Sequence, residues 1–441
     1  MLERYFGLKE KQTNVQTEVL AGITTFLTMA YIIFVNPKIL GDAGMDRKSL
    51  IIVTCLVTAA ATTLTGIFTN APIAMAPGMG LNAFLTYSLV KAGKTDWQTA
   101  LGIVFLASLL CFILTLLGLR KKLVEAIPAS LIAAISVGIG LFITFIGLVH
   151  MGIIVNNEDT LISAGPLKNT ALIALAGLLV MAFLETRKIK GALLAGIIIS
   201  TILAVIFRLI PRPESLVSFN LNISPVAFKL NIKDAFEWGL LGSIFTLMFM
   251  DLFDSIGTLV ACCHEAKMED EHGKIKGLDR LLGIDASASM LGAALGSSTI
   301  TSYIESAAGI EEGGRTGLTA IVCGLCFLLA IPFAPLVGVV PDYATGPALV
   351  MVGLFMIREV KRINFASMEE GFPAFIIMIM IALSYSISTG LAFGFLSYVV
   401  IKIFTGKAGH IKFTMWIIAL LCLVFLMLEK ISDFIKAITP A

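Results

Sequence analysis

The stretch SSTITSYIESAAGIEEGGRTG, from Ser297 to Gly317, lies between two apolar runs, one ending at Leu295 and one beginning at Leu318. Its hydroxyl side chains, glycines and three glutamates make it too polar for a helix that faces lipid. At membrane depth, irregular backbone is tolerated only where protein buries it or where it lines a cavity. The sequence therefore predicts that this stretch lies beside a cavity inside a membrane protein.

The composition of the whole chain supports this interpretation. Of its 441 residues, 57% are hydrophobic and only 14% are charged. Soluble domains have about 45–50% apolar and about 25% charged residues. The apolar residues form runs long enough to cross a bilayer core of about 30 Å, whereas a β-barrel would need short alternating segments. We therefore expect an all-α polytopic membrane protein. The net charge of +2 gives no sign of nucleic-acid binding.

The apolar runs form two groups of seven, followed by a tail run at 412–429 that would either span the membrane or lie at its interface. The first group covers 19–38, 49–69, 73–90, 99–118, 126–148, 170–186 and 189–209. The second covers 239–262, 281–296, 299–313, 318–340, 344–357, 371–387 and 389–405. Because seven is odd, the second group would enter the membrane in the opposite direction, as in inverted-repeat transporters. We expect a first repeat at 1–210, a linker outside the cell at 211–236, a second repeat at 237–406 and a tail helix at 407–441.

The distribution of basic residues favours a cytoplasmic N-terminus in a multi-pass protein of the cell (inner or plasma) membrane. The loops that would face the cytoplasm contain Arg120, Lys121, Lys122, Arg187, Lys188, Lys190, Lys267, Lys274, Lys276, Arg280, Arg358, Lys361 and Arg362. No basic residue is expected in the central part of any span. The histidines His150, His264, His272 and His410 are expected at the surface.

A second segment, APIAMAPGMGLNAF at 71–84, also interrupts the helical pattern. Pro72 and Pro77 remove backbone donors, and Gly78 and Gly80 permit unusual dihedral angles. One interpretation is an ordinary loop with glycine packing, and the other is a half-helix that meets an extended strip. Both broken segments are third in their group of seven, and such matching interruptions point to a central binding site.

Four acidic residues are predicted at membrane depth: Asp251 and Asp254 in the eighth span, Asp285 in the ninth and Glu305 in the broken tenth. An intramembrane carboxylate costs about 2.5 kcal/mol or more, so it is usually functional or paired. The spacing of three puts Asp251 and Asp254 on one helix face, which suits a shared proton. For each acid, a structural hydrogen bond is the alternative. Carboxylates without a cation suit a neutral ligand, a cation or a proton, and they fit the N–H edge of a flat heterocycle.

Long blocks of the sequence resemble the guanine/hypoxanthine permease family, the AzgA-like branch of the nucleobase:cation symporters in the xanthine/uracil permease superfamily. They are TNVQTEVLAGITTFLTMAYIIFVNP (13–37), APIAMAPGMGLNAF (71–84), IPASLIAAISVGIGLFITFIGL (127–148), FMDLFDSIGTLV (249–260), TSYIESAAGIEEGGRTGLTA (301–320) and PDYATGPALVMVG (341–353). The resemblance implies fourteen spans in two inverted sevens, with core and gate domains and paired extended strips in the third and tenth spans. It also implies elevator-like import of a purine nucleobase coupled to protons, often within a homodimer in the lipid bilayer.

The resemblance also implies roles for individual residues. The residues expected to bind the base are Asp254, Thr258, Tyr303, Glu305 and Ser306, together with the third-span strip Gly78, Met79, Gly80 and Asn82. Those expected to couple protons are Asp251, Asp254, Asp285 and Glu305. Some relatives have histidine in place of Thr258, so the role of this residue is left open.

Several alternatives remain at this point. Related members move adenine rather than guanine or hypoxanthine, and a carboxylate can bind sodium as well as a proton. A channel built from the broken half-helices and an anion exchanger with the same fold are further alternatives. No H-E-x-x-H or G-x-S-x-G motif occurs, so we expect no enzyme, cofactor or metal site.

Overall fold

Each half of the chain folds into a series of membrane-length helices. The computed structural model describes residues 2–120, 127–211, 215–219, 221–268, 275 and 277–438. Within these residues, nine helices are long and apolar enough to cross a membrane. Five of the residues used in the charge and histidine predictions lie outside the described residues: Lys121, Lys122, His272, Lys274 and Lys276.

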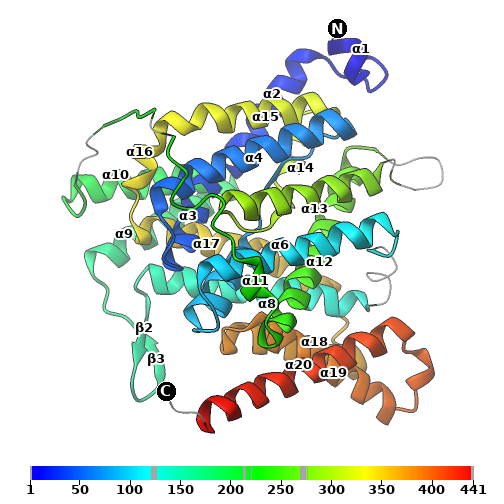
Figure 1. Ribbon diagram of the computed structural model, residues 1–441. Coiled ribbons are helices and arrows are strands. Elements are labelled where there is room, and N and C mark those ends of the chain that lie inside the picture. The colour runs from blue at the N-terminus through cyan, green and yellow to red at the C-terminus, as the bar shows by residue number, and fades with distance from the viewer. Residues whose placement is uncertain are drawn as a thin grey trace.

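The first half begins with a short helix, and its third segment is broken. Its elements are α1 (Leu2–Phe6), α2 (Val15–Met29), α3 (Ile32–Asp42), α4 (Arg47–Thr69), β1 (Met75–Pro77), α5 (Met79–Ala83), the π-helix η1 (Phe84–Lys91), α6 (Trp97–Leu116), α8 (Ala129–His150), β2 (Ile154–Asn157), β3 (Leu161–Ala164), α9 (Asn169–Thr186) and α10 (Ala192–Ile206). Side-chain caps from Asn14, Asp46 and Asp96 start α2, α4 and α6. The β2–β3 hairpin, which the sequence did not predict, projects from the helices in Figure 1.

The second half also has a short strand followed by a half-helix in its third segment. Its elements are α11 (Ile232–Ala235), α12 (Leu241–Glu265), α13 (Leu278–Leu295), β4 (Ile300–Ser302), α14 (Ser306–Glu311), α15 (Gly317–Ala330), α16 (Ala334–Gly338), α17 (Asp342–Ile357), α18 (Met368–Ser384), α19 (Ile387–Phe404) and α20 (Phe413–Ile438). The tail run forms α20, which packs against α19. The predicted all-α fold of two sevens, with strips in segments three and ten, is confirmed.

The helices pack in two groups, which correspond to the expected core and gate. α2 to α6 pack with α12 to α15, and α8 to α10 pack with α17 to α19 (Figure 1). Glycine contacts join α8 to α17. A Cβ on Gly147 would lie 2.8 Å from the Gly346 oxygen, and one on Gly353 would lie 2.5 Å from the Gly140 oxygen. These contacts run in opposite directions along the chain, so α8 and α17 are antiparallel, as an inverted repeat requires.

The position of the third-span strip differs from the prediction. The sequence placed it at Gly78 to Asn82, but the strand is Met75–Pro77, and Gly78 is the N-cap of α5. The reason is proline: Pro77 disfavours helix at Ala76 and has no N–H for a helical hydrogen bond. The first predicted span is also divided, because α2 ends at Met29 and α3 begins at Ile32.

Candidate substrate site

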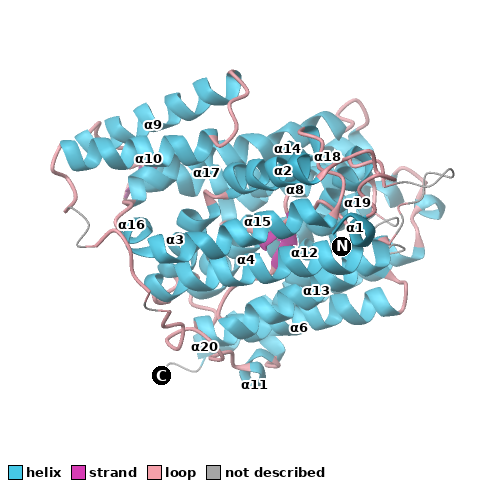
Figure 2. Cartoon of the chain, turned by 90° about the horizontal axis from the view of Figure 1, so that it is seen from above, coloured by secondary structure: helices cyan, strands magenta, loops and turns pink. Residues whose placement is uncertain are grey.

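Two short strands from opposite halves of the chain meet in the middle of the protein. β1 and β4 are antiparallel, with Met75 opposite Ser302 and Pro77 opposite Ile300. Figure 2 shows the pair in magenta, surrounded by helices. Each strand leads into a half-helix, α5 or α14, so two helix N-termini lie next to the strand pair. Helix N-termini carry partial positive charge and unpaired N–H groups, which makes this a suitable place for a polar ligand.

Hydroxyl groups satisfy the outer edges of both strands. Thr62 in α4 both donates to the Met75 oxygen (2.9 Å) and accepts from the Met75 nitrogen (3.0 Å). Ser289 in α13 does the same for Ile300, at 2.7 and 3.0 Å. These two residues come from the second and ninth segments, which correspond in an inverted repeat. Neither residue was predicted from the sequence, although unpaired strand edges at this depth need such partners.

Tyr303 and Ser306, both predicted to bind substrate, bond to the strip backbone. The Tyr303 hydroxyl donates to the Pro77 oxygen at 2.5 Å, and the Ser306 hydroxyl accepts from the Ala74 nitrogen at 3.0 Å. Both side chains are buried. They join the two broken segments to each other, and direct contact with a ligand remains a prediction for both.

Asp254 and Glu305 are the two predicted ligand acids whose side chains are not buried. Asp254 is exposed, and it precedes Ser255 of α12, whose backbone oxygen accepts a hydrogen bond from Ser302 of β4. Glu305 is half-buried at the N-cap of α14, and the Tyr31 hydroxyl donates to its Oε1 at 2.7 Å. A Cβ on Gly257, one turn beyond Asp254, would meet open space. Both carboxyls are therefore accessible near the strand pair, and their contact with a ligand remains a prediction.

The remaining predicted ligand residues are more enclosed. Thr258 is half-buried and Met79 is buried. A Cβ on Gly78 would lie 3.0 Å from Thr301 Oγ1, and one on Gly80 would lie 2.7 Å from Ile139 of α8. Gly80 is therefore a close contact between the core and gate groups.

Asn82 belongs to a buried amide chain next to the third-span strip. Its Nδ2 donates to Asn36 Oδ1 at 2.5 Å, and Asn36 Nδ2 donates to Thr54 at 2.8 Å. The Oδ1 of Asn82 has no partner among the described residues. The amide therefore keeps one free acceptor near the strip.

The sequence profile of the Permease family (Xan_ur_permease) matches residues 16–393. The adenine permease AdeP of Escherichia coli is 42% identical over 96% of this chain and 95% of its own length. The guanine/hypoxanthine permease PbuG of Bacillus subtilis is 37% identical over 96% of this chain and 100% of its own. The chain belongs to the nucleobase permease family.

Solved structures show that the permease fold is shared more widely. The transmembrane domain of a cyanobacterium bicarbonate transporter, BicA, aligns with a TM-score of 0.63 at 16% identity, covering 84% of this permease and 96% of that chain. The murine anion transporter Slc26a9 in the inward-facing state also gives 0.63, at 9% identity, covering 89% of this chain and 69% of its own. At these identities the likeness concerns the fold alone.

Two basic residues that the sequence placed in a loop or at the end of a span are buried among the helices. Arg120 was assigned to a loop, but it is 1% exposed and pairs with Asp285 at 3.0 Å. Lys38, at the end of the first span, is buried and pairs with Asp342. His150 is not a surface residue either, because only 12% of its side chain is exposed and its Nε2 lies 3.3 Å from Asp42. His264 and His410 are exposed as expected.

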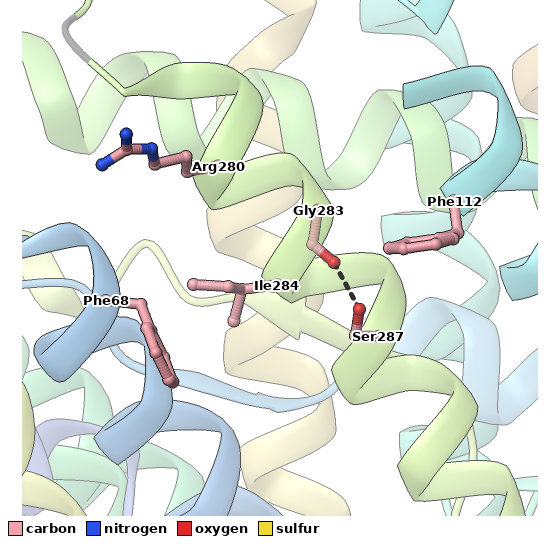
Figure 3. A pocket seen from close by; sticks show the side chains of 6 residues that line it. All are labelled: Phe68, Phe112, Arg280, Gly283, Ile284 and Ser287. Atoms are coloured by element: carbon pink, nitrogen blue, oxygen red, sulfur yellow. Dashed lines mark hydrogen bonds between the residues drawn. The ribbon is translucent and has the colours of Figure 1, made fainter. Parts of the chain in front are cut away.

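A groove on the surface of the permease is separate from this site. It encloses about 340 Å³ between α4, α6 and α13 (Figure 3). Its lining residues are Phe68, Phe112, Arg280, Gly283, Ile284 and Ser287. It contains none of the predicted ligand or coupling residues, so we place the candidate substrate site at the strand pair.

Proposed function

We propose that this permease imports purine nucleobases by proton symport, with guanine and hypoxanthine as the first substrates to test. The observation that supports this proposal is the arrangement of Asp254 and Glu305. They come from the second half of the chain, are not buried, lie near a strand pair built from both halves, and form no ion pair among the described residues. A neutral, flat molecule with several N–H groups fits such acceptors better than an anion does.

The chemistry of the base edge links substrate choice to protonation. Tyr31 donates to Oε1 of Glu305, and because each carboxylate oxygen can accept two hydrogen bonds, both oxygens can still accept from a ligand. Guanine presents two adjacent N–H donors, which suit an ionised carboxylate. Adenine presents one donor beside a ring nitrogen that accepts, which suits a protonated carboxyl. Adenine is the second candidate because the E. coli adenine permeases AdeP and AdeQ are 42% and 40% identical to this chain.

The proposed transport cycle is alternating access, and the exposure of residues along two helices supports an opening at one end of the protein. Along α12, the exposed residues Asp254, Gly257, Ala261 and His264 form a stripe from the site to the C-terminal end of the helix. At the start of α14 and along it, Ile304, Glu305, Ala307, Ala308 and Glu311 are likewise exposed or half-buried. Both helices end on the face of the protein that carries the N-terminus, near the start of α2 and α15. We propose that this face is cytoplasmic and that the permease is inward-open.

We propose that a polar cluster closes the opposite end by joining the core and gate groups. This cluster, called the outer latch, consists of Lys38, Asp42, Tyr87, His150 and Asp342. Lys38 of α3 pairs with Asp342 at the start of α17. Asp42 accepts a hydrogen bond from Tyr87 at 2.9 Å and lies 3.3 Å from His150 Nε2 at the end of α8. A site that is open at one end and closed at the other fits elevator-like movement of the core, with the strand pair and both acids, against the gate.

The proposed repeats are 1–210 and 237–406, with 211–236 as linker and 407–441 as tail helix. Each proposed repeat contributes one strand to the pair and helices to both packing groups. Movement of the core would therefore carry both strands together.

The outer latch leads to a prediction about opening. Asp342→Ala removes the partner of a buried lysine, so the latched state loses an interaction worth up to about 1 kcal/mol, equivalent to about fivefold in population. Amide hydrogen exchange in segments 79–91 and 342–350 should accelerate by up to about fivefold. The matched control is Glu311→Ala, which breaks the exposed core–gate pair with Lys190 at the other end. Equal exchange in both variants would contradict the role of the latch.

The proposed function is tested by uptake in cells that lack their own purine carriers. Uptake of radiolabelled hypoxanthine or guanine should saturate, run faster at acid than at alkaline external pH, and collapse with a protonophore. Competition with adenine and uracil would define the substrate range. Sodium-driven uptake would overturn proton coupling. Current without saturation would favour a channel, and chloride-dependent exchange would favour an anion carrier.

A further inference from the structure

Arg120 is a buried cation in the core of the permease. It lies beyond the end of α6, but its guanidinium reaches inward to α13. Nη2 donates to Asp285 Oδ2 at 3.0 Å, and Nη1 donates to the Leu282 oxygen at 3.2 Å. The side chains of Arg120 and Asp285 are 1% and 0% exposed. An ion pair this deeply buried is shielded from water and salt, unlike the exposed pairs at the surface.

The second oxygen of Asp285 connects this ion pair to the substrate site. Ser255 Oγ donates to Asp285 Oδ1 at 2.9 Å, so both carboxylate oxygens have a partner. Ser255 follows Asp254 in α12, and its backbone oxygen accepts from Ser302 of β4 at 3.3 Å. A continuous chain of contacts therefore leads from Arg120 through Asp285 and Ser255 to the strand pair.

Asp251 has a different environment within the same core. It is 1% exposed, its Oδ1 lies 3.5 Å from the Ser255 hydroxyl, and its Oδ2 has no hydrogen-bond partner among the described residues. A buried carboxyl with a free oxygen can take up a proton without breaking an existing bond. Asp285 cannot, because protonation would break a bond to a guanidinium that stays charged in proteins and would leave that charge uncompensated.

We propose that Arg120 is a positioning residue of the transport core. Its ion pair with Asp285 persists throughout the cycle. Through the bond between Asp285 and Ser255, the pair keeps the face of α12 that carries Asp254 aligned with β4. The proton that accompanies the substrate is then carried by the other acids, and Asp285 takes no part in proton coupling. This last step rests on the proposed proton symport, whereas the positioning role does not.

The test compares Arg120→Gln and Asp285→Asn with the double variant that carries both changes. Each single change leaves one buried charge without its partner, so each should lower the melting temperature in detergent and strongly reduce uptake. Replacing both members of a buried pair is often nearly neutral. We therefore expect the double variant to melt higher than either single variant and to transport within about tenfold of the wild type, with the wild-type pH profile and protonophore sensitivity. Lys190 and Glu311 form an exposed pair, with side chains 34% and 60% exposed. The same single and double changes there should show no such recovery of the melting temperature in the double variant.

Two results would overturn the proposal. A double variant that folds and exchanges labelled base across the membrane, but no longer responds to pH or protonophore, would make Asp285 a coupling acid. A double variant that melts no higher than the single variants would show that the two residues do not compensate each other. If the wild type takes up no purine, the proposed function fails, but the melting comparison still decides whether Arg120 and Asp285 act as a pair.

Discussion

Replacing Glu305 with alanine should abolish nucleobase uptake while the protein still reaches the membrane. Glu305 is half-buried at the start of α14, and Tyr31 fixes one of its oxygens. Hydrogen bonds to a charged group contribute about 1.5–3 kcal/mol each, so the loss of two bonds to the base should reduce uptake by about 100-fold or more. Uptake is measured with labelled hypoxanthine and guanine and normalised to the amount of protein in the membrane.

Two further variants make the Glu305 test specific. Glu311→Ala removes an exposed carboxylate from the same helix and should leave uptake within about twofold of the wild type, because exposed ion pairs contribute little. Glu305→Gln keeps an oxygen for the Tyr31 hydroxyl but removes the charge, so it should also lose most uptake. Normal uptake by Glu305→Ala would remove this residue from the site.

Replacing Glu18 with alanine should have the largest effect on stability. Glu18 of α2 is fully buried and accepts hydrogen bonds from the start of α15. Its five partners are the backbone nitrogens of Arg315, Thr316 and Thr319 and the hydroxyls of Thr316 and Thr319. The carboxylate caps a helix N-terminus on a distant segment, where a negative charge is also favoured by the helix dipole.

Glu18→Ala leaves several buried donors unsatisfied, so we expect a loss of about 3–5 kcal/mol in the free energy of unfolding. A thermal melt in detergent measures the change. Glu3→Ala is the matched control, because Glu3 is exposed and pairs only with Lys9 within the described residues. A melting temperature for Glu18→Ala equal to that of Glu3→Ala would contradict the capping role.

The broken segments were predictable from sequence because proline and glycine act locally. Pro77 and the polar residues after Gly296 forbid a lipid-facing helix whatever surrounds them, and the structure confirms a strand at each position. The strand was nevertheless predicted several residues too late, since the pattern alone did not show which side of Pro77 would be extended.

The residues that support the site were mostly missed because their roles depend on distant partners. Arg120 stands at the end of an apolar run. There the sequence does not distinguish a basic residue in a loop from one whose side chain turns back among the helices. Glu18 stands in a polar N-terminal segment and caps a helix nearly 300 residues away. Thr62 and Ser289 did leave a signal, since each is a hydroxyl among small residues in matching second and ninth segments.

The most direct test of the central claim is purine uptake by the purified permease reconstituted into proteoliposomes, with an imposed pH gradient. With acid outside, labelled hypoxanthine or guanine should accumulate transiently above its external concentration. Without the gradient it should only equilibrate, and liposomes carrying Glu305→Ala should take up no more than empty ones. Absence of any purine uptake by folded, inserted wild-type protein would contradict the account.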